Sequence, residues 1–597
     1  MYSVALPIKQ HDLLEIQDAT REVISDKITT VAHVCNRILL VTPPQVPEEY
    51  FDVEMARQKR YPAFPPYGLS IINKRLHENG YVSEIIDLNY EVLASLHSTR
   101  RSFHYSVWQS KLQKRIEEFK PDLIGITCMF SMTAPQMYKV AEFIKKSYKN
   151  LPIIAGGVHV TTAARTVLAE CRSIDFISLY EGDTSFVAII DFINKKTTVD
   201  ALRHIATQQK SRYFSLDNQL REYDIDAVPD YGSLPIGEYH TLGKIGAYHW
   251  LLDDKVCASA ILSNRGCRGS CTYCSVNAFC GRGVRSRKVQ VIVDEMECLK
   301  EKYNITHFMW LDDDLLYNRR RALELFHAIV KRNMNISWDA SNGVIAASIT
   351  PEIVDVAYKS GCIGLHLGIE SGNQKILASI RKPSDLDDYR TAAAILKQYP
   401  GIFTKGFLMV GFTDETIGQV LDTVNLALEL QLDWYPIQIL TVFPSTEIQK
   451  SLSDNAGRRM GFKDKFFIGA TGGQRLREKN EKVEAKEFKN LLAADPHIVP
   501  SDEQLKDIWF LVDYKVNYER ILTEERIIKL NMIKKMLRDI CNRVPENPLS
   551  TLFFGILEEK LGKHRASQEL KVQAKTYLDN STYWQKRFEV LNLYRYL

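Results

Sequence analysis

Short apolar runs alternate with helical patterns twice along this chain of 597 residues. In the first series, apolar side chains such as Met137, Val140 and Ile144 recur three or four positions apart, as on one face of a helix. Strands that alternate with helices predict a parallel sheet covered on both faces. We therefore expect a doubly wound, flavodoxin-like α/β domain over residues 35–195, after an N-terminal lead-in of residues 1–34. Its predicted strands are residues 38–41, 81–87, 123–128, 153–155 and 176–179.

The second series spans residues 255–450 and includes amphipathic helices such as residues 416–430. Six strand–helix units predict a partial (β/α)6 TIM barrel, whose chemistry lies at the carboxyl ends of its strands. Residues 196–254 are polar and predict a linker, while residues 451–597 are charged with helical spacing and predict a helical C-terminal domain. The predicted barrel strands are residues 260–263, 305–311, 336–341, 363–369, 403–410 and 435–442.

The first barrel strand leads into a loop that carries Cys267, Cys271 and Cys274 in a C-x3-C-x2-C array. Three thiolates on one short loop can hold three irons of a 4Fe-4S cluster, which leaves the fourth iron open to an outside molecule. A structural zinc site is the alternative, but zinc usually takes four ligands. Cys257 or Cys280 would then have to complete the set, so both metals stay open at this point.

Polar residues gather where the other barrel strands end. Acidic side chains fit poorly at an apolar barrel mouth unless they meet a cation or a hydroxyl group. The alternatives are a helix N-cap or solvated turn for Asp312 and Asp313, and a surface salt bridge for Glu370. Asp314 fits a cap and a ligand equally well, and the ring of Tyr273 could simply pack beneath a cluster.

The cysteine array, with Tyr273 before its last cysteine, resembles the signature of the radical S-adenosylmethionine enzymes. In that family the open iron binds the amino and carboxylate groups of S-adenosylmethionine, and one electron then cleaves the sulfonium to a 5'-deoxyadenosyl radical. The resemblance implies a 4Fe-4S cluster on the three cysteines and an S-adenosylmethionine site at the barrel mouth. The residues that it implies for that site are Tyr273, Asp312, Asp313, Asn342, Glu370 and Val410.

Residues 35–195 resemble the cobalamin-binding domain that precedes many radical S-adenosylmethionine cores. The match lies in Phe-Pro-Pro-Tyr-Gly-Leu at 64–69, in the glycine pair before His159, and in Glu-Gly-Asp at 181–183. Ligands of doubly wound sheets bind beyond the carboxyl ends of the strands. The implied cobalamin-binding residues are Thr127, Ser131, Thr133, Gly156, Gly157, His159, Glu181 and Gly182.

The chain departs from many cobalamin proteins in the residue that would bind the cobalt atom. Many cobalamin proteins carry an Asp-x-His-x-x-Gly motif whose histidine binds cobalt from below, and this chain has none. We therefore expect His159 to be a loop residue near the cofactor and not a cobalt ligand. A doubly wound domain without any ligand stays open, because some relatives keep the domain after losing cobalamin.

If both resemblances hold, they imply a cobalamin-dependent methyltransferase that acts on an unactivated carbon. An oxidase, cyclase or ring-rearranging enzyme with the same domain pair is the first alternative. Methylthio transfer would need further cysteines for a second cluster. From another class, a non-catalytic iron–sulfur redox or sensor module stays open, although it would not need an S-adenosylmethionine pocket.

Composition limits the partners of this chain. A formal net charge of +4 on so long a chain does not indicate a nucleic-acid-binding surface. We therefore expect a small-molecule or peptide substrate and no nucleic acid. No apolar run reaches the length of a transmembrane helix, and no signal peptide is predicted. Reduced thiols and an oxygen-sensitive cluster indicate the cytoplasm and an electron donor such as flavodoxin or ferredoxin.

The C-terminal region has no recognisable cofactor motif. Residues 470–473 predict a turn, and the C-terminal helices predict a cap over the barrel, with a scaffold or dimerisation role as the alternative.

Overall fold

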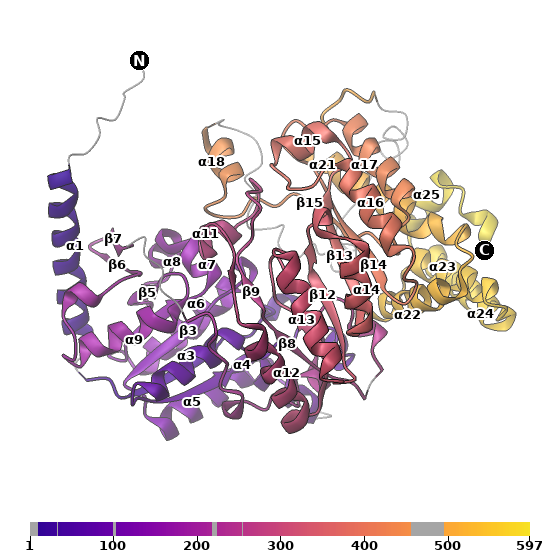
Figure 1. The fold of residues 1–597 in the computed structure, drawn as a ribbon. Coiled ribbons are helices and arrows are strands. Elements are labelled where there is room, and N and C mark those ends of the chain that lie inside the picture. Colours follow the sequence, from indigo (N-terminus) through magenta and orange to yellow (C-terminus); the bar gives the residue numbers. More distant parts are fainter. Residues whose placement is uncertain (1–9, 33, 99–102, 218–223, 254, 455–494) are drawn as a thin grey trace, which may run out of the picture. The chain divides into compact units, whose positions relative to one another are not determined.

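The computed structural model describes residues 10–32, 34–98, 103–217, 224–253, 255–454 and 495–597 (Figure 1). The chain divides into two compact units. The first comprises residues 1–244 together with 278–281, and the second comprises residues 245–277 and 282–597.

The first unit contains a seven-stranded sheet in the order β2-β1-β3-β4-β5-β6-β7. Its first five strands are parallel, and the order 2-1-3-4-5 is that of flavodoxin-like folds. This confirms the predicted doubly wound α/β fold. The strands are β1 (Arg37–Thr42), β2 (Val82–Asp87), β3 (Leu123–Thr127), β4 (Ile153–Gly156), β5 (Phe176–Ser178), β6 (Ile205–Gln209) and β7 (Arg212–Leu216).

The helices of the first unit follow its strands, and side chains from several of them pack against the sheet in an apolar core. They are α1 (Gln10–Val31), α2 (Val53–Arg57), α3 (Tyr67–Glu78), α4 (Leu88–Ser98), α5 (Val107–Phe119), α6 (Ala134–Ser147), α7 (Val158–Thr162), α8 (Ala164–Glu170), α9 (Gly182–Ile193) and α10 (Tyr239–Leu242).

Strands β6 and β7 lie in the segment that the sequence predicts as a linker. They form an antiparallel hairpin, and β6 extends the sheet by pairing with β5. Lys210 and Ser211 make the two-residue turn with φ angles of 46° and 64°. Such a turn needs positive φ at both positions and is usually signalled by Asn-Gly or Asp-Gly. Lysine and serine carry no such signal, which explains why the hairpin was not predicted.

Most of the N-terminal segment that the sequence predicts as a lead-in forms helix α1. Its Ile24 and Ile28 are fully buried. The Lys27 ammonium donates hydrogen bonds to the Thr207 hydroxyl of β6 (2.7 Å) and to the Gln208 carbonyl oxygen (2.9 Å). The helix is therefore fastened to the hairpin by apolar packing and by one lysine.

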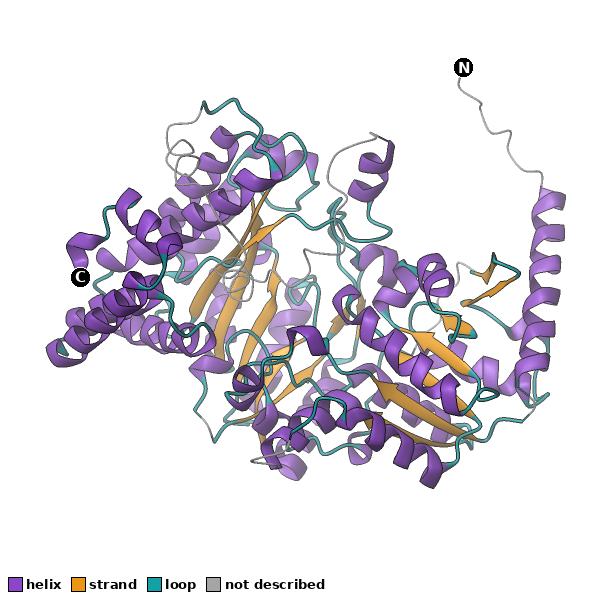
Figure 2. Cartoon of the chain, turned by 180° about the vertical axis from the view of Figure 1, so that it is seen from behind, coloured by secondary structure: helices purple, strands orange, loops and turns teal. Residues whose placement is uncertain are grey.

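The second unit is built on a six-stranded parallel sheet in the order β15-β14-β13-β12-β11-β8. The sheet curls into a partial barrel, and helices cover its outer face (Figure 2). This confirms the predicted partial TIM barrel. Its strands are β8 (Cys257–Ile261), β11 (Ile305–Trp310), β12 (Ser337–Val344), β13 (Cys362–Glu370), β14 (Phe403–Val410) and β15 (Ile437–Ile439), and the short strands β9 (Asn264–Arg265) and β10 (Arg285–Ser286) form a separate ribbon.

Helices follow the strands in alternation, and further helices make up the C-terminal region. The barrel helices are α12 (Val289–Tyr303), α13 (Arg319–Lys331), α14 (Pro351–Lys359), α15 (Gln374–Ser379), α16 (Leu386–Leu396) and α17 (Ile417–Leu430). After them come α18 (Glu447–Asp454), α21 (Asp502–Asp513), a π-helix (Tyr514–Tyr518), α22 (Ile527–Arg543), α23 (Pro548–Lys560), α24 (His564–Asp579) and α25 (Thr582–Val590), while α11 (Val276–Cys280) follows the cysteine loop. The predicted turn at 470–473 lies outside the described residues.

Residues 245–251 pack against the interior face of the barrel strands near their amino ends. The ammonium of Lys405 on β14 donates to the Ala247 carbonyl oxygen (2.9 Å), and the Ala247 N–H donates to the Ser341 hydroxyl of β12 (2.8 Å). Tyr248 lies against Gly364, where an added Cβ would stand only 2.5 Å from the tyrosine ring. The segment therefore fills this end of the barrel, and the carboxyl ends of the strands remain for ligands.

The C-terminal helices cover the edge strand of the sheet. On the π-helix, the side-chain amide of Asn517 accepts a hydrogen bond from the Tyr435 N–H (2.7 Å) and donates one to the Tyr435 carbonyl oxygen (2.8 Å). The Trp509 indole N–H donates to the Ile437 carbonyl oxygen (2.9 Å). Side chains thus complete the backbone hydrogen bonding beside β15, where the sheet has no further strand. Among the described residues, every helix is too short or too polar to span a membrane.

We predict that Asn517→Ala weakens this edge by about 2 kcal/mol, because two buried backbone groups lose their partners. Hydrogen exchange at the amides of residues 435–440 should accelerate accordingly. The control is Asn531→Ala, which removes a hydrogen bond on an exposed helix surface and should leave exchange at this edge unchanged. Equal exchange in the two variants would contradict the assignment.

Candidate cofactor-binding sites

The cysteine loop follows β8 and folds back on itself through glycine. The Gly269 N–H points at the Cys267 sulfur (N to S, 3.3 Å), and the Cys274 N–H donates to the Cys271 carbonyl oxygen (3.1 Å). A Cβ added at Gly269 would lie 3.4 Å from the Cys267 sulfur and 3.7 Å from the Cys271 sulfur. An alanine methyl group at position 269 would therefore be in van der Waals contact with both sulfurs.

The arrangement of the thiols fits a cluster better than a single ion. Among the described residues, no three His, Cys, Asp or Glu side chains converge closely enough to hold one metal ion. In a cubane cluster each cysteine binds a different iron, so the sulfurs need not meet at one point. Burial raises the pKa of Cys267 to about 11 and also raises that of Cys271. Both thiols therefore stay protonated at neutral pH until a metal displaces the protons.

Two buried aspartates at the end of β11 hold the start of the cysteine loop. Asp312 is 2% exposed and accepts hydrogen bonds from the N–H groups of Ser263 (2.8 Å) and Asn264 (2.6 Å) and from the Ser263 hydroxyl (2.5 Å). Asp314 binds the Arg268 guanidinium through both oxygens, at 2.7 and 2.9 Å. Both carboxylates are thus engaged inside the protein, a structural role that the sequence did not reveal.

Asp313 and Asn342 lie at the same end of the barrel. Asp313 accepts a hydrogen bond from the Gly266 N–H, and burial raises its pKa to about 6. Its charge also acts on the Cys267 and Cys274 thiols, so it lies near the predicted cluster. Asn342 at the end of β12 is exposed and donates to the Leu311 carbonyl oxygen (2.8 Å).

Glu370 ends β13 with a φ of 67° and is 7% exposed. It forms an ion pair with Lys382 (2.8 Å), whose ammonium lies 3.5 Å from the Tyr273 hydroxyl. Burial lowers the pKa of Lys382, but the charges of Glu370 and Cys271 outweigh it and the pKa stands above its ordinary value. The ion pair is therefore buried beside the cysteine loop, not a surface salt bridge. Lys382 was missed by the sequence analysis.

An apolar group adjoins this ion pair. Tyr273 packs with Phe412 (ring centroids 6.2 Å apart) and with Ile376 and Ile380. Val410, the last residue of β14, is fully buried. Its predicted contact with S-adenosylmethionine stays a prediction.

In the first unit, the predicted cobalamin residues lie where β3, β4 and β5 end. Thr127 ends β3 and pairs with Gly156 at the end of β4. Gly157 has a φ of 110°, and a Cβ there would stand 2.5 Å from the Cys128 carbonyl oxygen, so only glycine fits. His159 on α7 shares a hydrogen bond with the Ser131 hydroxyl (2.8 Å). Thr127, Ser131 and the two glycines therefore meet at one edge of the sheet.

The remaining predicted cobalamin residues are largely engaged within the protein. The Thr133 hydroxyl is buried and donates to the Phe130 carbonyl oxygen (2.8 Å). Glu181 is 8% exposed and precedes Gly182, which begins α9. A Cβ at Gly182 would lie 3.4 Å from the Ser178 hydroxyl of β5. Their contact with cobalamin stays a prediction.

Unpaired buried groups indicate that a ligand fits this edge. Within the described residues, the Thr42 hydroxyl at the end of β1 and both side-chain amide atoms of Gln136 on α6 are buried without a hydrogen-bond partner. Such groups are costly unless a ligand or water satisfies them. Met129 and Phe130 on the loop after β3 are 56% and 53% exposed. Polar atoms in need of partners beside an apolar loop suit a large amphipathic cofactor such as cobalamin.

We predict that Gly269→Ala lowers the iron bound per chain several-fold, because the methyl group would occupy the space between two cluster ligands. Ser270→Ala, in the same loop, should load normally. Iron and sulfide analysis after anaerobic reconstitution, with the visible spectrum of the cluster, measures both. Full loading of the alanine variant at 269 would contradict this placement of the cluster.

His159 makes the stability of the first unit dependent on pH. Burial lowers its pKa from 6.5 to about 4, so the unfolded chain binds the proton more tightly. Stability is fully present above pH 6.5 and falls as the pH drops toward 4, by about 3 kcal/mol at most. Urea unfolding of the full chain, followed by hydrogen exchange in residues 123–160, should show this loss in the wild type and a smaller one in His159→Gln. Identical pH profiles would contradict it.

Comparison with known proteins agrees with both sites. Residues 55–190 match the model of the B12 binding domain, and residues 261–427 match that of the Radical SAM superfamily. An uncharacterized methyltransferase of Pyrococcus horikoshii is 27% identical over 57% of this chain and 71% of the relative. The cytidylyl-2-hydroxyethylphosphonate methyltransferase of Streptomyces wedmorensis is 24% identical over 58% of this chain and 68% of the relative.

A solved structure shows the same fold. The radical S-adenosylmethionine methyltransferase TsrM from Kitasatospora setae, with cobalamin and a [4Fe-4S] cluster bound, superposes with a TM-score of 0.61 at 16% identity, over 90% of this chain and 99% of TsrM. The fold and the two family matches agree with the expected cofactor set of cluster, S-adenosylmethionine and cobalamin. The chain therefore contains a domain of the Radical SAM superfamily, preceded by a B12 binding domain.

Proposed function

We propose that this enzyme is a cobalamin-dependent methyltransferase that acts on an unactivated carbon of a small-molecule or peptide substrate. The observation that carries the proposal is the pairing, in one chain, of two sites. One is a three-cysteine loop beside a buried Glu370–Lys382 pair, and the other is a B12-type sheet whose ligand edge keeps unpaired polar atoms. The two relatives described above that are named methyltransferases support methyl transfer as the reaction.

When bound, the cluster and S-adenosylmethionine supply hydrogen abstraction from carbon, and cobalamin supplies the methyl group. Cys267, Cys271 and Cys274 would hold the cluster. Lys382 and Glu370 present opposite charges that match the carboxylate and the ammonium or hydroxyl groups of S-adenosylmethionine. Like Glu370, Asp313 is an acidic residue near the cysteines of the cluster loop.

Apolar residues of the barrel would exclude water from the site beside the cysteine loop. Tyr273 and Phe412 pack beside the ion pair, and residues 245–251 fill the opposite end of the barrel. His366 of β13 stacks on Phe407 with ring centroids 4.4 Å apart. Burial lowers the pKa of His366 well below its ordinary value, so the ring is neutral. Apolar and aromatic packing beside this site suits chemistry in which a reactive radical must not meet water.

The enzyme also needs one-electron reduction of its cluster. We propose an acidic carrier of the flavodoxin or ferredoxin type as the donor, and a reducing compartment such as the cytoplasm as the setting. Both follow from the chemistry of an oxygen-sensitive cluster held by free thiols.

The product pattern tests the proposed reaction. A methyltransferase that draws on a second S-adenosylmethionine for cobalamin should form both 5'-deoxyadenosine and S-adenosylhomocysteine, and should transfer a deuterated methyl group into one component of a metabolite extract. Formation of 5'-deoxyadenosine alone, with an oxidised or rearranged product, would assign the chain to the oxidase or cyclase class.

Cysteine variants test the site itself. We predict that Cys271→Ala reduces formation of 5'-deoxyadenosine at least a thousandfold, because the cluster loses one of its three protein ligands. Cys298→Ala on α12 removes a cysteine outside the array and should leave activity unchanged. Mass spectrometry of the reconstituted enzymes measures both. Cleavage by the Cys271 variant at the wild-type rate would refute the cluster assignment, and a cluster without any cleavage in the wild type would favour a redox or sensor module.

A further inference from the structure

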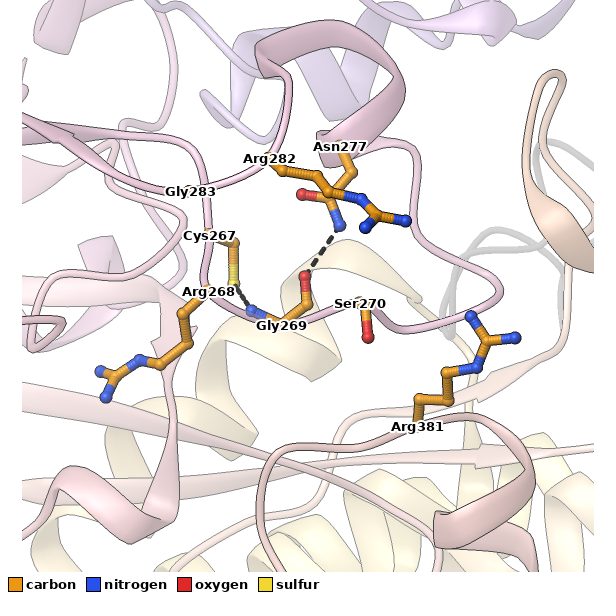
Figure 3. Close-up of a pocket in the computed structure, with 8 residues that line it drawn as sticks. All are labelled: Cys267, Arg268, Gly269, Ser270, Asn277, Arg282, Gly283 and Arg381. Carbon is orange, nitrogen blue, oxygen red and sulfur yellow. Dashed lines mark hydrogen bonds between the residues drawn. The ribbon is translucent and has the colours of Figure 1, made fainter.

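A basic pocket of about 360 Å³ borders the cysteine loop (Figure 3). It shares Cys267 with the predicted cluster, but it shares no residue with the group of Tyr273, Glu370 and Lys382. The pocket therefore reaches the cluster ligands without belonging to the predicted S-adenosylmethionine site. Its lining comprises Cys267, Arg268, Gly269, Ser270, Asn277, Arg282, Gly283 and Arg381.

The three arginines of the pocket differ in how their charges are balanced. Arg268 is paired with the buried Asp314, and Arg381 is paired with Glu447 of α18. Arg282 is exposed and, among the described residues, has no ion pair or hydrogen bond. Figure 3 shows its side chain extending over the stretch of the loop that carries Gly269 and Ser270. One uncompensated positive charge thus lies directly over the cluster loop.

Seven of the eight lining residues come from one basic segment of the sequence. Residues 256–293 contain six Lys and Arg residues and no Asp or Glu. Arg287 is buried against Glu295, but Arg282 and Lys288 are exposed. Glu447 balances Arg381 outside this segment, so the excess positive charge rests on Arg282 and the basic residues near it. A net positive surface attracts a partner of opposite sign and speeds their encounter.

We propose that this pocket is the docking site of a reduced flavodoxin, an acidic one-electron carrier, and that Arg282 is its main electrostatic contact. The proposal rests on the cluster of the proposed function. One electron passes from the flavin hydroquinone, which becomes the semiquinone, to the oxidised cluster, which becomes the reduced cluster. No covalent bond forms or breaks. The pocket is concave and adjoins Cys267, so a projecting flavin edge would meet the cluster through one of its own ligands.

An exposed basic rim favours a protein partner over a small anion. Two of the three guanidinium groups already have carboxylate partners, so the pocket lacks the convergent set of free donors that would capture a free phosphate or carboxylate. A protein surface with many carboxylates can bind through net electrostatic attraction to the exposed basic residues. It does not need a hydrogen bond to every guanidinium group.

Binding and electron transfer test the proposal separately from methylation. Stopped-flow mixing of the reconstituted enzyme with flavodoxin hydroquinone should show loss of the cluster's visible absorbance at a rate that falls as salt is added. In Arg282→Glu, the association rate constant at low salt should fall about tenfold, because one rim charge is reversed. Arg320→Glu, an exposed arginine of α13 outside the pocket, is the matched control and should behave as the wild type.

Dithionite as a chemical reductant completes the design. It should reduce the clusters of the wild type and both variants equally, because it needs no docking surface. Equal association rates for the wild type and Arg282→Glu would overturn the proposal, as would faster reduction by ferredoxin than by flavodoxin. A loss of substrate conversion in Arg282→Glu under dithionite would instead assign the pocket to an anionic substrate. Failure to detect methylation would leave these measurements untouched, so the two proposals fail separately.

Discussion

The buried carboxylates that follow β11 are the constraint on which the catalytic unit depends. Asp312 holds the chain where it leaves β8, and Asp314 holds Arg268 inside the cysteine array. Burying charge is costly unless every oxygen finds a donor, and here backbone N–H groups, a hydroxyl and a guanidinium provide the donors. The cysteines are therefore positioned by the barrel and not by the loop alone. A flexible loop would have to be ordered by the cluster itself.

In both units the predicted ligand site lies at the carboxyl ends of parallel strands. In each, parallel strands end together and the loops that follow carry the polar side chains. The first unit adds glycine where the chain must approach another backbone closely, as at Gly157 beside Cys128. The second adds a buried ion pair, Glu370 with Lys382, beside an apolar group around Phe412. One unit thus offers hydrogen-bonding edges for a large cofactor, and the other offers charge in a dry setting.

Much of this could be predicted from the sequence, because strand runs and cysteine spacing are local signals. All eleven expected strands are present within a few residues of their predicted places. The β6–β7 hairpin was missed because Lys210 and Ser211 adopt positive φ without a sequence signal for it. Lys382 was missed because its partner Glu370 is set by tertiary packing. The roles of Asp312 and Asp314 were not predictable for the same reason, since a run of three aspartates does not show which of them point inward.

The Asn517 amide occupies the place beside β15 that a seventh strand would take. An unsealed strand edge is a template on which another molecule can stack, and proteins usually block it with charge, proline or a bulge. Here a distant part of the polypeptide does so with side chains. The C-terminal helices therefore guard against self-association of the barrel, and a shortened chain would be prone to aggregate even if every cofactor contact were intact.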